Sequence, residues 1–196
     1  MEYVIKKQPL EEAQKIRVDY PNWGLKEYLP ETYAQIAYDE TGFYVKFVVK
    51  ESNPQADRTV HHTSICRDSC VEFFVIFDPE HSEKYLNIEV NPIGTVNAAL
   101  RVSRADFVAL TDEEINALQI KPFVKEDEWG VQYFLSIEFL QSKYPEFKLE
   151  NCKYIKGNMY QCGNEHMPNH RLSLFPVLTE QPDFHRPEYF GIIKVE

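Results

Sequence analysis

The stretch CVEFFVIF, residues 70–77, is an almost unbroken apolar run with turn residues directly after it. Such a run is typical of a central strand that is covered on both faces. Further on, LNIEV, residues 86–90, alternates apolar residues with Asn87 and Glu89. This period of two predicts a neighbouring strand that points its Asn and Glu side chains to one face. These two predicted strands set the fold class.

Two further segments show the same alternation. Residues 43–50 alternate apolar and polar side chains after turn chemistry at 39–42, so 33–38 and 43–50 are predicted to form a hairpin. Residues 131–139 alternate in the same way after the turn residues 126–130, which predicts another strand.

One short helix is predicted, in a connection between strands. Thr111 and Glu114 have the spacing of a capping box ahead of the apolar Ile115. Several strands with hardly any helix predict an all-β, antiparallel two-sheet β-sandwich with short helical connections. Neither a repeat nor a low-complexity linker marks a boundary, so 1–196 is interpreted as one domain.

Composition and charge exclude several classes of protein. The 196 residues are 43% hydrophobic and 14% aromatic, enough for a substantial core. The net charge of -10 repels phosphate backbones and anionic lipids, so nucleic acid and membranes are disfavoured as partners. Residues 1–10 lack the long apolar core of a secretion signal, which predicts a cytoplasmic location as written, or an extracellular one if a leader was removed.

The four cysteines are interpreted as free, buried thiols. Cys66, Cys70, Cys152 and Cys162 could form two disulfides, but a core this rich in aromatic residues does not need them. Their spacing contains no Cys-x-x-Cys pair, which argues against a structural zinc site.

Motifs of catalysis are missing from the sequence. It has no phosphate-binding glycine loop, no Gly-x-Ser-x-Gly elbow and no His-Glu-x-x-His pair. Glu72, Glu89 and Glu138 all fall in predicted strands and could converge as a glycosidase pair. Strand carboxylates more commonly face solvent or bind a neighbouring group, so we expect a protein that is not an enzyme.

Four runs of the sequence are informative together: RDSCVEFF (67–74), YLNIEVN (85–91), GNMYQCGN (157–164) and PDFHRPEYFG (182–191). They resemble, in the same order, segments of the family-9-like carbohydrate-binding modules. The resemblance covers most of the chain. It implies a jelly-roll type of sandwich and a non-catalytic module that holds a mono- or oligosaccharide between two tryptophans, beside polar side chains.

The resemblance also implies site residues. Glu72 matches a hydroxyl-binding carboxylate of the family, and Asn91 lies near an expected polar contact, so with Glu89 they would form a polar floor. The two clamp positions hold Cys66 and Leu174 in place of tryptophan. Because neither side chain offers a flat π surface, we expect a weakened or altered sugar site.

Three aromatic residues need separate assignments. Phe175 could replace the clamp at Leu174, although strand alternation would send its ring to the other face. Trp23 and Trp129 sit beside turn residues and are interpreted as core or hairpin packing rather than a relocated clamp.

Some members of this group hold structural calcium, so the resemblance implies a calcium site. Asp57, Asp68 and Asp78 are the candidate donors, since calcium requires hard oxygen ligands. Calcium is not required by this interpretation.

Two alternatives remain open. Distantly related sandwiches enclose haem, for which Met159, His170 and His185 are the candidate axial ligands. The chain could also be a structural or protein-interaction domain that kept the scaffold and lost its ligand.

Overall fold

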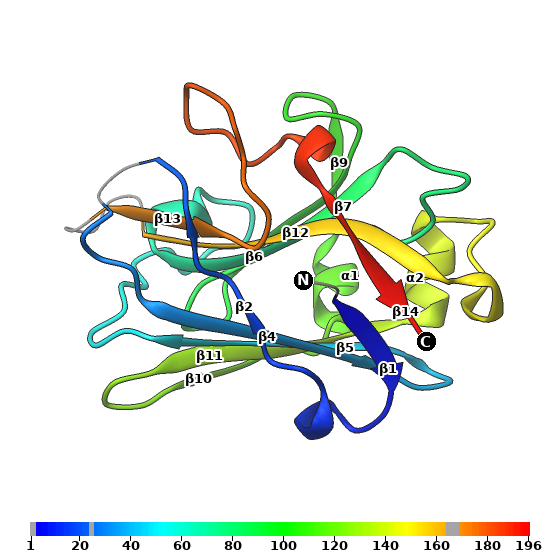
Figure 1. Cartoon of the computed structure of the whole chain (residues 1–196), viewed down its shortest axis with the longest axis horizontal. Coiled ribbons are helices and arrows are strands. Elements are labelled where there is room, and N and C mark those ends of the chain that lie inside the picture. The colour runs from blue at the N-terminus through cyan, green and yellow to red at the C-terminus, as the bar shows by residue number, and fades with distance from the viewer. Residues whose placement is uncertain (1–2, 24–25, 164–168) are drawn as a thin grey trace.

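Two facing layers of strands form the protein (Figure 1). The structure, a computed structural model, describes residues 3–23, 26–163 and 169–196. We call the layer drawn uppermost in Figure 1 the upper sheet. Its strands are, in order, β9 (Phe107–Ala109), β8 (Val96–Arg101), β7 (Tyr85–Val90), β6 (Ser69–Ile76) and β12 (Tyr154–Gly163). Two more strands, β13 (His170–Ser173) and β14 (Gly191–Val195), pair with β12, and β3 (Tyr20–Pro21) pairs with β13. The lower sheet contains β10 (Lys121–Val124), β11 (Trp129–Ser136), β5 (Gly42–Lys50) and β4 (Glu31–Tyr38), with β2 (Ile16–Arg17) paired to β4.

The first strand, β1 (Val4–Lys7), joins the two sheets. Its first half pairs with β14 of the upper sheet, and Lys6 and Lys7 pair with β4 of the lower sheet. Both pairings are parallel, whereas all other strand pairs within the described residues are antiparallel. The two-sheet sandwich predicted from the sequence is therefore confirmed, with one side closed by β1.

Strand β6 is buried at every position, as the apolar run predicted. Val71, Phe73 and Val75 belong to one face of the strand and lie in the main hydrophobic core. The opposite face of β6 carries Cys70, Glu72 and Phe74 and is the outer face of the upper sheet. That face is covered by the segment between β13 and β14, which crosses over it (Figure 1).

The predicted hairpin and the predicted helix are both present. Strands β4 and β5 pair from Tyr38 opposite Phe43 to Glu31 opposite Lys50. Helix α1 (Asp112–Ala117) begins after Thr111, whose side chain accepts a hydrogen bond from the backbone N–H of Glu114, and the reciprocal bond completes the capping box.

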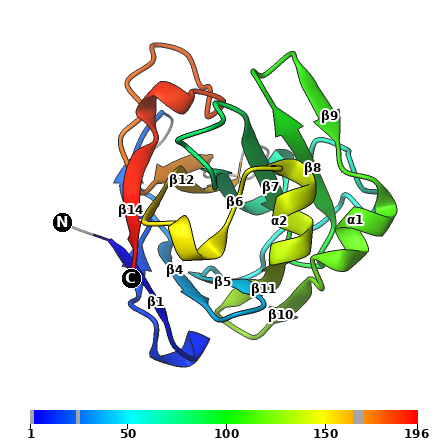
Figure 2. The ribbon, with the colours of Figure 1, turned by 90° about the vertical axis from the view of Figure 1, so that its right-hand side faces the viewer.

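The alternating segment 131–139 is only partly a strand. Strand β11 ends at Ser136, and helix α2 (Ile137–Lys143) follows, because the Ser136 hydroxyl accepts the Phe139 backbone N–H and caps the helix. Glu138 is therefore exposed on a helix, and the prediction that it lies in a strand beside the other carboxylates is wrong. Figure 2 shows α1 and α2 together at one end of the sandwich.

Short 3-10 helices occupy several connections. They are η1 (Leu10–Glu12), η2 (Ile65–Arg67), η3 (Leu149–Asn151) and η4 (Pro187–Tyr189). Over the described ranges, helices are too short or too polar to cross a membrane.

Candidate functional site

A hollow of about 190 Å³ lies on the outer face of the upper sheet, beneath the segment between β13 and β14. We call it the outer hollow. Its lining comes from segments spread along most of the chain: Trp23, Cys66, Glu72, Glu89, Arg104, Arg171 and the run from Pro182 to His185.

The floor consists of two carboxyl groups. Glu72 on β6 and Glu89 on β7 are direct partners in the antiparallel register, so their side chains leave the sheet side by side. Both are buried. Burial raises the pKa of Glu72 well above its ordinary value, and the nearby Cys162 and Glu89 raise it further. Glu72 is thus favoured as a neutral acid, which can both donate and accept a hydrogen bond.

Glu89 is held by a chain of polar side chains on the same face. The Asn87 amide donates to Glu89 Oε1 at 3.0 Å, and Arg101 Nε donates to Asn87 Oδ1 at 2.5 Å. Burial raises the pKa of Glu89, while hydrogen bonds from Asn97 and Asn87 and the charge of Arg101 act in the opposite direction. These hydrogen bonds fix the orientation of the Glu89 carboxyl group before any ligand binds.

Aromatic rings form one wall. Trp23 and Phe184 approach with ring centroids 5.4 Å apart, and Phe184 stacks on Tyr160 at 4.0 Å. The Trp23 indole N–H donates to the carbonyl of Thr179 at 2.7 Å, which fixes the position of the ring. Two rings therefore contribute apolar surface to the outer hollow.

His185 forms a second wall. Its ring stacks on Phe74 with centroids 4.8 Å apart, and Nδ1 lies 3.0 Å from the Tyr85 hydroxyl. Burial, followed by the charges of Arg101 and Arg104, lowers the pKa of His185 to about 3. The imidazole is neutral at physiological pH and adds no positive charge to the site.

The rim carries two guanidinium groups. Arg104 forms an ion pair with Asp183 at 3.0 Å. Arg171, on β13, makes no ion pair with any side chain in the described ranges. Its donors remain available to an acceptor on a ligand.

The structure brings three of the six sequence-predicted ligand-binding residues together. Cys66, Glu72 and Glu89 all line the outer hollow. Asn91 does not, because its amide donates to the Asp68 carboxylate and to the Arg58 carbonyl and so ties down the loop before β6.

The other two predicted residues lie elsewhere. Leu174 is in the main core, because even-numbered residues of β13 and its continuation face the sandwich interior. The Phe175 ring packs edge-on against Tyr3, at 5.7 Å, and is absent from the hollow lining. Both residues follow the end of β13 at Ser173, and neither side chain lines the outer hollow.

The outer hollow also contains residues that were not predicted. Trp23, interpreted as a packing residue, both packs on Phe184 and lines the hollow, whereas Trp129 is fully buried as predicted. Arg104 and Arg171 lie in a turn and on a short strand without a motif. The run 182–191 was singled out only by its resemblance, which could have pointed to Phe184 and His185.

The three aspartates proposed for calcium do not share a site. Asp68 and Asp78 flank β6 at opposite ends, about 30 Å apart at the usual rise of a strand. The Asp68 carboxylate is already paired with Arg58 at 2.7 Å and bonded by Asn91. Asp57 is exposed. Their placement supplies no set of converging oxygen ligands.

The three candidate haem ligands are also separated. Met159 faces the interior from β12, while His185 lies over the outer face of the same sheet. His170 pairs in register with Gly163, about 13 Å along the strand from Met159. The His170 ring contacts Gln161 and Tyr28, and the three candidate side chains are not grouped around one position.

A two-sheet sandwich with an aromatic and hydrogen-bonding hollow on an outer face has the architecture of a sugar-binding module. The profile of carbohydrate-binding family 9 matches residues 5–195, and the chain belongs to this family. The family consists of non-catalytic carbohydrate-binding modules, so the prediction that the protein is not an enzyme is confirmed.

Three solved structures are similar to this chain in fold. A protein from Bacteroides uniformis, proposed to bind carbohydrate, has a TM-score of 0.81 at 22% identity, with 100% of both chains covered. A family 9 module from Caldicellulosiruptor kristjanssonii with cellotriose has a TM-score of 0.69 at 11% identity, covering 100% of this chain and 94% of that one. The same module with glucose gives 0.68 at 10%, covering 100% and 96%. None of the curated proteins is a significant match.

Proposed function

We propose that the chain binds the end of a carbohydrate in the outer hollow. Glu72 and Glu89 would bind sugar hydroxyls from the floor, and Trp23 with Phe184 would contact the C–H face of the ring. The observation that carries the proposal is the convergence of Glu72 and Glu89 with these two rings in one hollow. The structural neighbours with bound cellotriose and glucose support the same class of ligand.

The proposed ligand is one terminal sugar ring. The hollow of about 190 Å³ is smaller than the roughly 300–1,000 Å³ typical of pockets for drug-sized molecules. The rim arginines Arg104 and Arg171 would bind hydroxyl oxygens at the open side. Because a cysteine and a leucine stand at the two clamp positions, we propose a weaker complex than a double tryptophan clamp would give, by about 1 kcal/mol for each lost ring contact.

Titration calorimetry against a panel of mono- and oligosaccharides tests this function. We expect heat of binding for at least one sugar in the millimolar range. If no sugar of the panel gives a heat of binding at that concentration, the proposal of sugar binding is wrong. The alternative of a structural or protein-interaction domain would then be favoured. The same result would leave the fold assignment untouched.

The Trp23→Ala variant tests the site itself. Loss of its ring contact should weaken binding about fivefold to tenfold, corresponding to about 1 kcal/mol. Phe123→Ala is the matched control, since this half-buried aromatic residue lies on β10 at the edge of the other sheet. Equal affinities of the two variants would contradict the proposed aromatic wall.

A further inference from the structure

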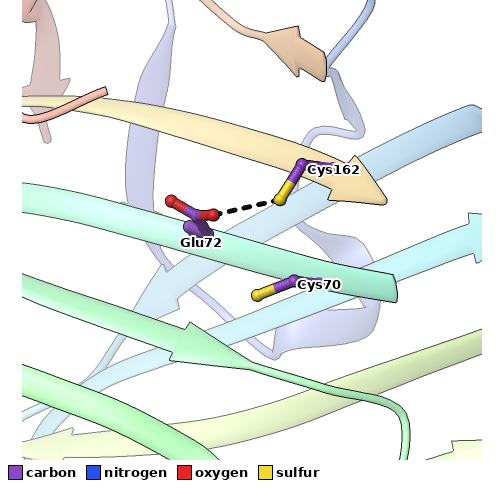
Figure 3. Close-up of side chains that lie close together, drawn as sticks. All are labelled: Cys70, Glu72 and Cys162. Carbon is purple, nitrogen blue, oxygen red and sulfur yellow. Dashed lines mark hydrogen bonds between the residues drawn. The ribbon is translucent and has the colours of Figure 1, made fainter. Parts of the chain in front are cut away.

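Two thiols and a carboxyl group lie close together on the neighbouring strands β6 and β12 (Figure 3). Cys70 on β6 is the direct register partner of Cys162 on β12, and Glu72 lies two positions further along the same face of β6. The possible ligand atoms of these three side chains all lie within 4.8 Å of one another. Cys162 Sγ donates to Glu72 Oε1 at 3.2 Å.

The cluster is buried but has a route to solvent. Cys70 and Cys162 are fully buried, and Glu72 is 2% exposed. Cys66 packs against the small buried cluster of Ile65, Cys70 and Cys162 and, together with Glu72, lines the outer hollow. An ion that enters the hollow would therefore meet Cys66 and Glu72 first and the two buried sulfurs behind them.

The distances are close to those of a tetrahedral thiolate site. Zinc lies about 2.3 Å from a thiolate sulfur and about 2.1 Å from a carboxylate oxygen. A tetrahedron with those bonds places two sulfurs about 3.8 Å apart and a sulfur about 3.6 Å from an oxygen. The observed separations reach these values with shifts of about 1 Å, within the range of small side-chain rotations.

We propose that the chain binds one thiophilic divalent cation, of the Zn²⁺ and Cd²⁺ class, through the thiolates of Cys70 and Cys162 and the carboxylate of Glu72. The fourth coordination position faces Cys66 and the outer hollow. Soft sulfur ligands select such ions over calcium and magnesium. Binding displaces one proton from each thiol and one from the carboxyl group into solvent. The inference does not rest on the proposed sugar binding: Glu72 belongs to both proposed sites, but the two thiolates and the metal readout belong to this one alone.

The spacing of the cysteines in the sequence could not reveal this group. A zinc motif is recognised by short intervals between ligands, and Cys70 and Cys162 are far apart in the chain. They meet only because β6 and β12 are adjacent in the upper sheet, with Cys70 and Cys162 in register.

The test is a Co²⁺ titration of the full chain, stripped of metal and kept reduced by a phosphine. We expect absorption bands of sulfur-to-metal charge transfer that saturate at one ion per chain, and displacement of Co²⁺ by Zn²⁺. The double variant Cys70→Ser/Cys162→Ser should lose these bands. Cys152→Ser is the control, because Cys152 lies outside the cluster. Absence of the bands in the wild type, or their persistence in the double variant, would overturn the proposal.

Two further measurements do not depend on the cysteine variants folding. Zinc-edge X-ray absorption of the wild-type complex should show two or three sulfur neighbours at about 2.3 Å, and a shell of nitrogen and oxygen alone would refute the site. Glu72→Gln should keep the charge-transfer bands and weaken Co²⁺ binding at least tenfold. Unchanged Co²⁺ affinity in Glu72→Gln would remove the carboxylate from the site. A protein that binds Co²⁺ but no sugar would separate the two proposals.

Discussion

Burial changes the proton affinity of two neighbouring carboxyl groups, those of Glu72 and Glu89. They lie side by side on β6 and β7, and burial raises the pKa of each carboxyl group. A carboxyl whose pKa is higher in the folded protein keeps its proton at a pH where the unfolded chain has lost it. Its contribution to stability is therefore full below the ordinary value of 4.5 and is lost as the pH rises through the folded pKa.

We predict that the Glu72→Gln substitution flattens the dependence of stability on pH. The wild type should lose on the order of 1 kcal/mol of unfolding free energy per pH unit between about 4.5 and the raised folded pKa, because the unfolded chain has released a proton that the folded protein still holds. Glutamine has no proton to lose. Urea unfolding across this pH range measures the difference, with Glu138→Gln on the exposed face of α2 as the control.

The pair titrates as a unit, so the single variant removes only part of the slope. Adding Glu89→Gln should remove most of what remains. Parallel curves for the wild type and Glu72→Gln would show that the Glu72 carboxyl is not shifted in the folded protein.

The sequence predicted the position of single residues correctly where strand alternation determines the face on which a side chain lies. The alternation in residues 86–90 placed Asn87 and Glu89 on one face, and the register then set Glu89 beside Glu72. It did not identify Trp23, because residues that enter a hollow from a loop have no periodicity. Leu174 was assigned to the site from a family position, but its place in the core depends on which face of β13 meets the interior.

At the scale of elements, α2 shows the limit of periodicity. Residues 131–139 alternate as a strand does, and Phe139 would continue the apolar face. The chain instead turns into a helix at Ser136, because a cap hydroxyl there allows Phe139 and Leu140 to be buried together. Helix α1 was predicted correctly, because its capping box and its apolar Ile115 both indicate a helix at the same place.

We predict that Ser136→Ala destabilises the protein by about 1 kcal/mol. The substitution leaves the Phe139 backbone N–H without its side-chain acceptor at the start of α2. Ser136→Thr, which keeps an acceptor oxygen, should cost clearly less. Denaturant midpoints of the three proteins provide the comparison, and equal losses for alanine and threonine would mean that the cap does not stabilise this helix.

At the scale of the molecule, the sandwich depends on a strand shared by its two sheets. Val4 and Ile5 pair with β14, and the next two residues pair with β4, so β1 crosses from one layer to the other. Figure 1 shows β1 and β14 together at this side. No pattern in the first ten residues predicts that β1 pairs with both sheets. The pairing with β14 joins segments that are far apart in the sequence.

We predict that Ile5→Ala destabilises the whole fold by about 2–5 kcal/mol, because it opens a cavity at a fully buried position where the two sheets meet. Ile192→Ala is the matched control, since Ile192 on neighbouring β14 is 58% exposed and should change stability by at most about 0.5 kcal/mol. Thermal and urea unfolding measure both. Sugar affinity of the folded Ile5→Ala protein should stay at the wild-type value, because Ile5 faces the core and not the outer hollow. A sugar affinity that fell together with stability would show that closure by β1 also shapes the binding face.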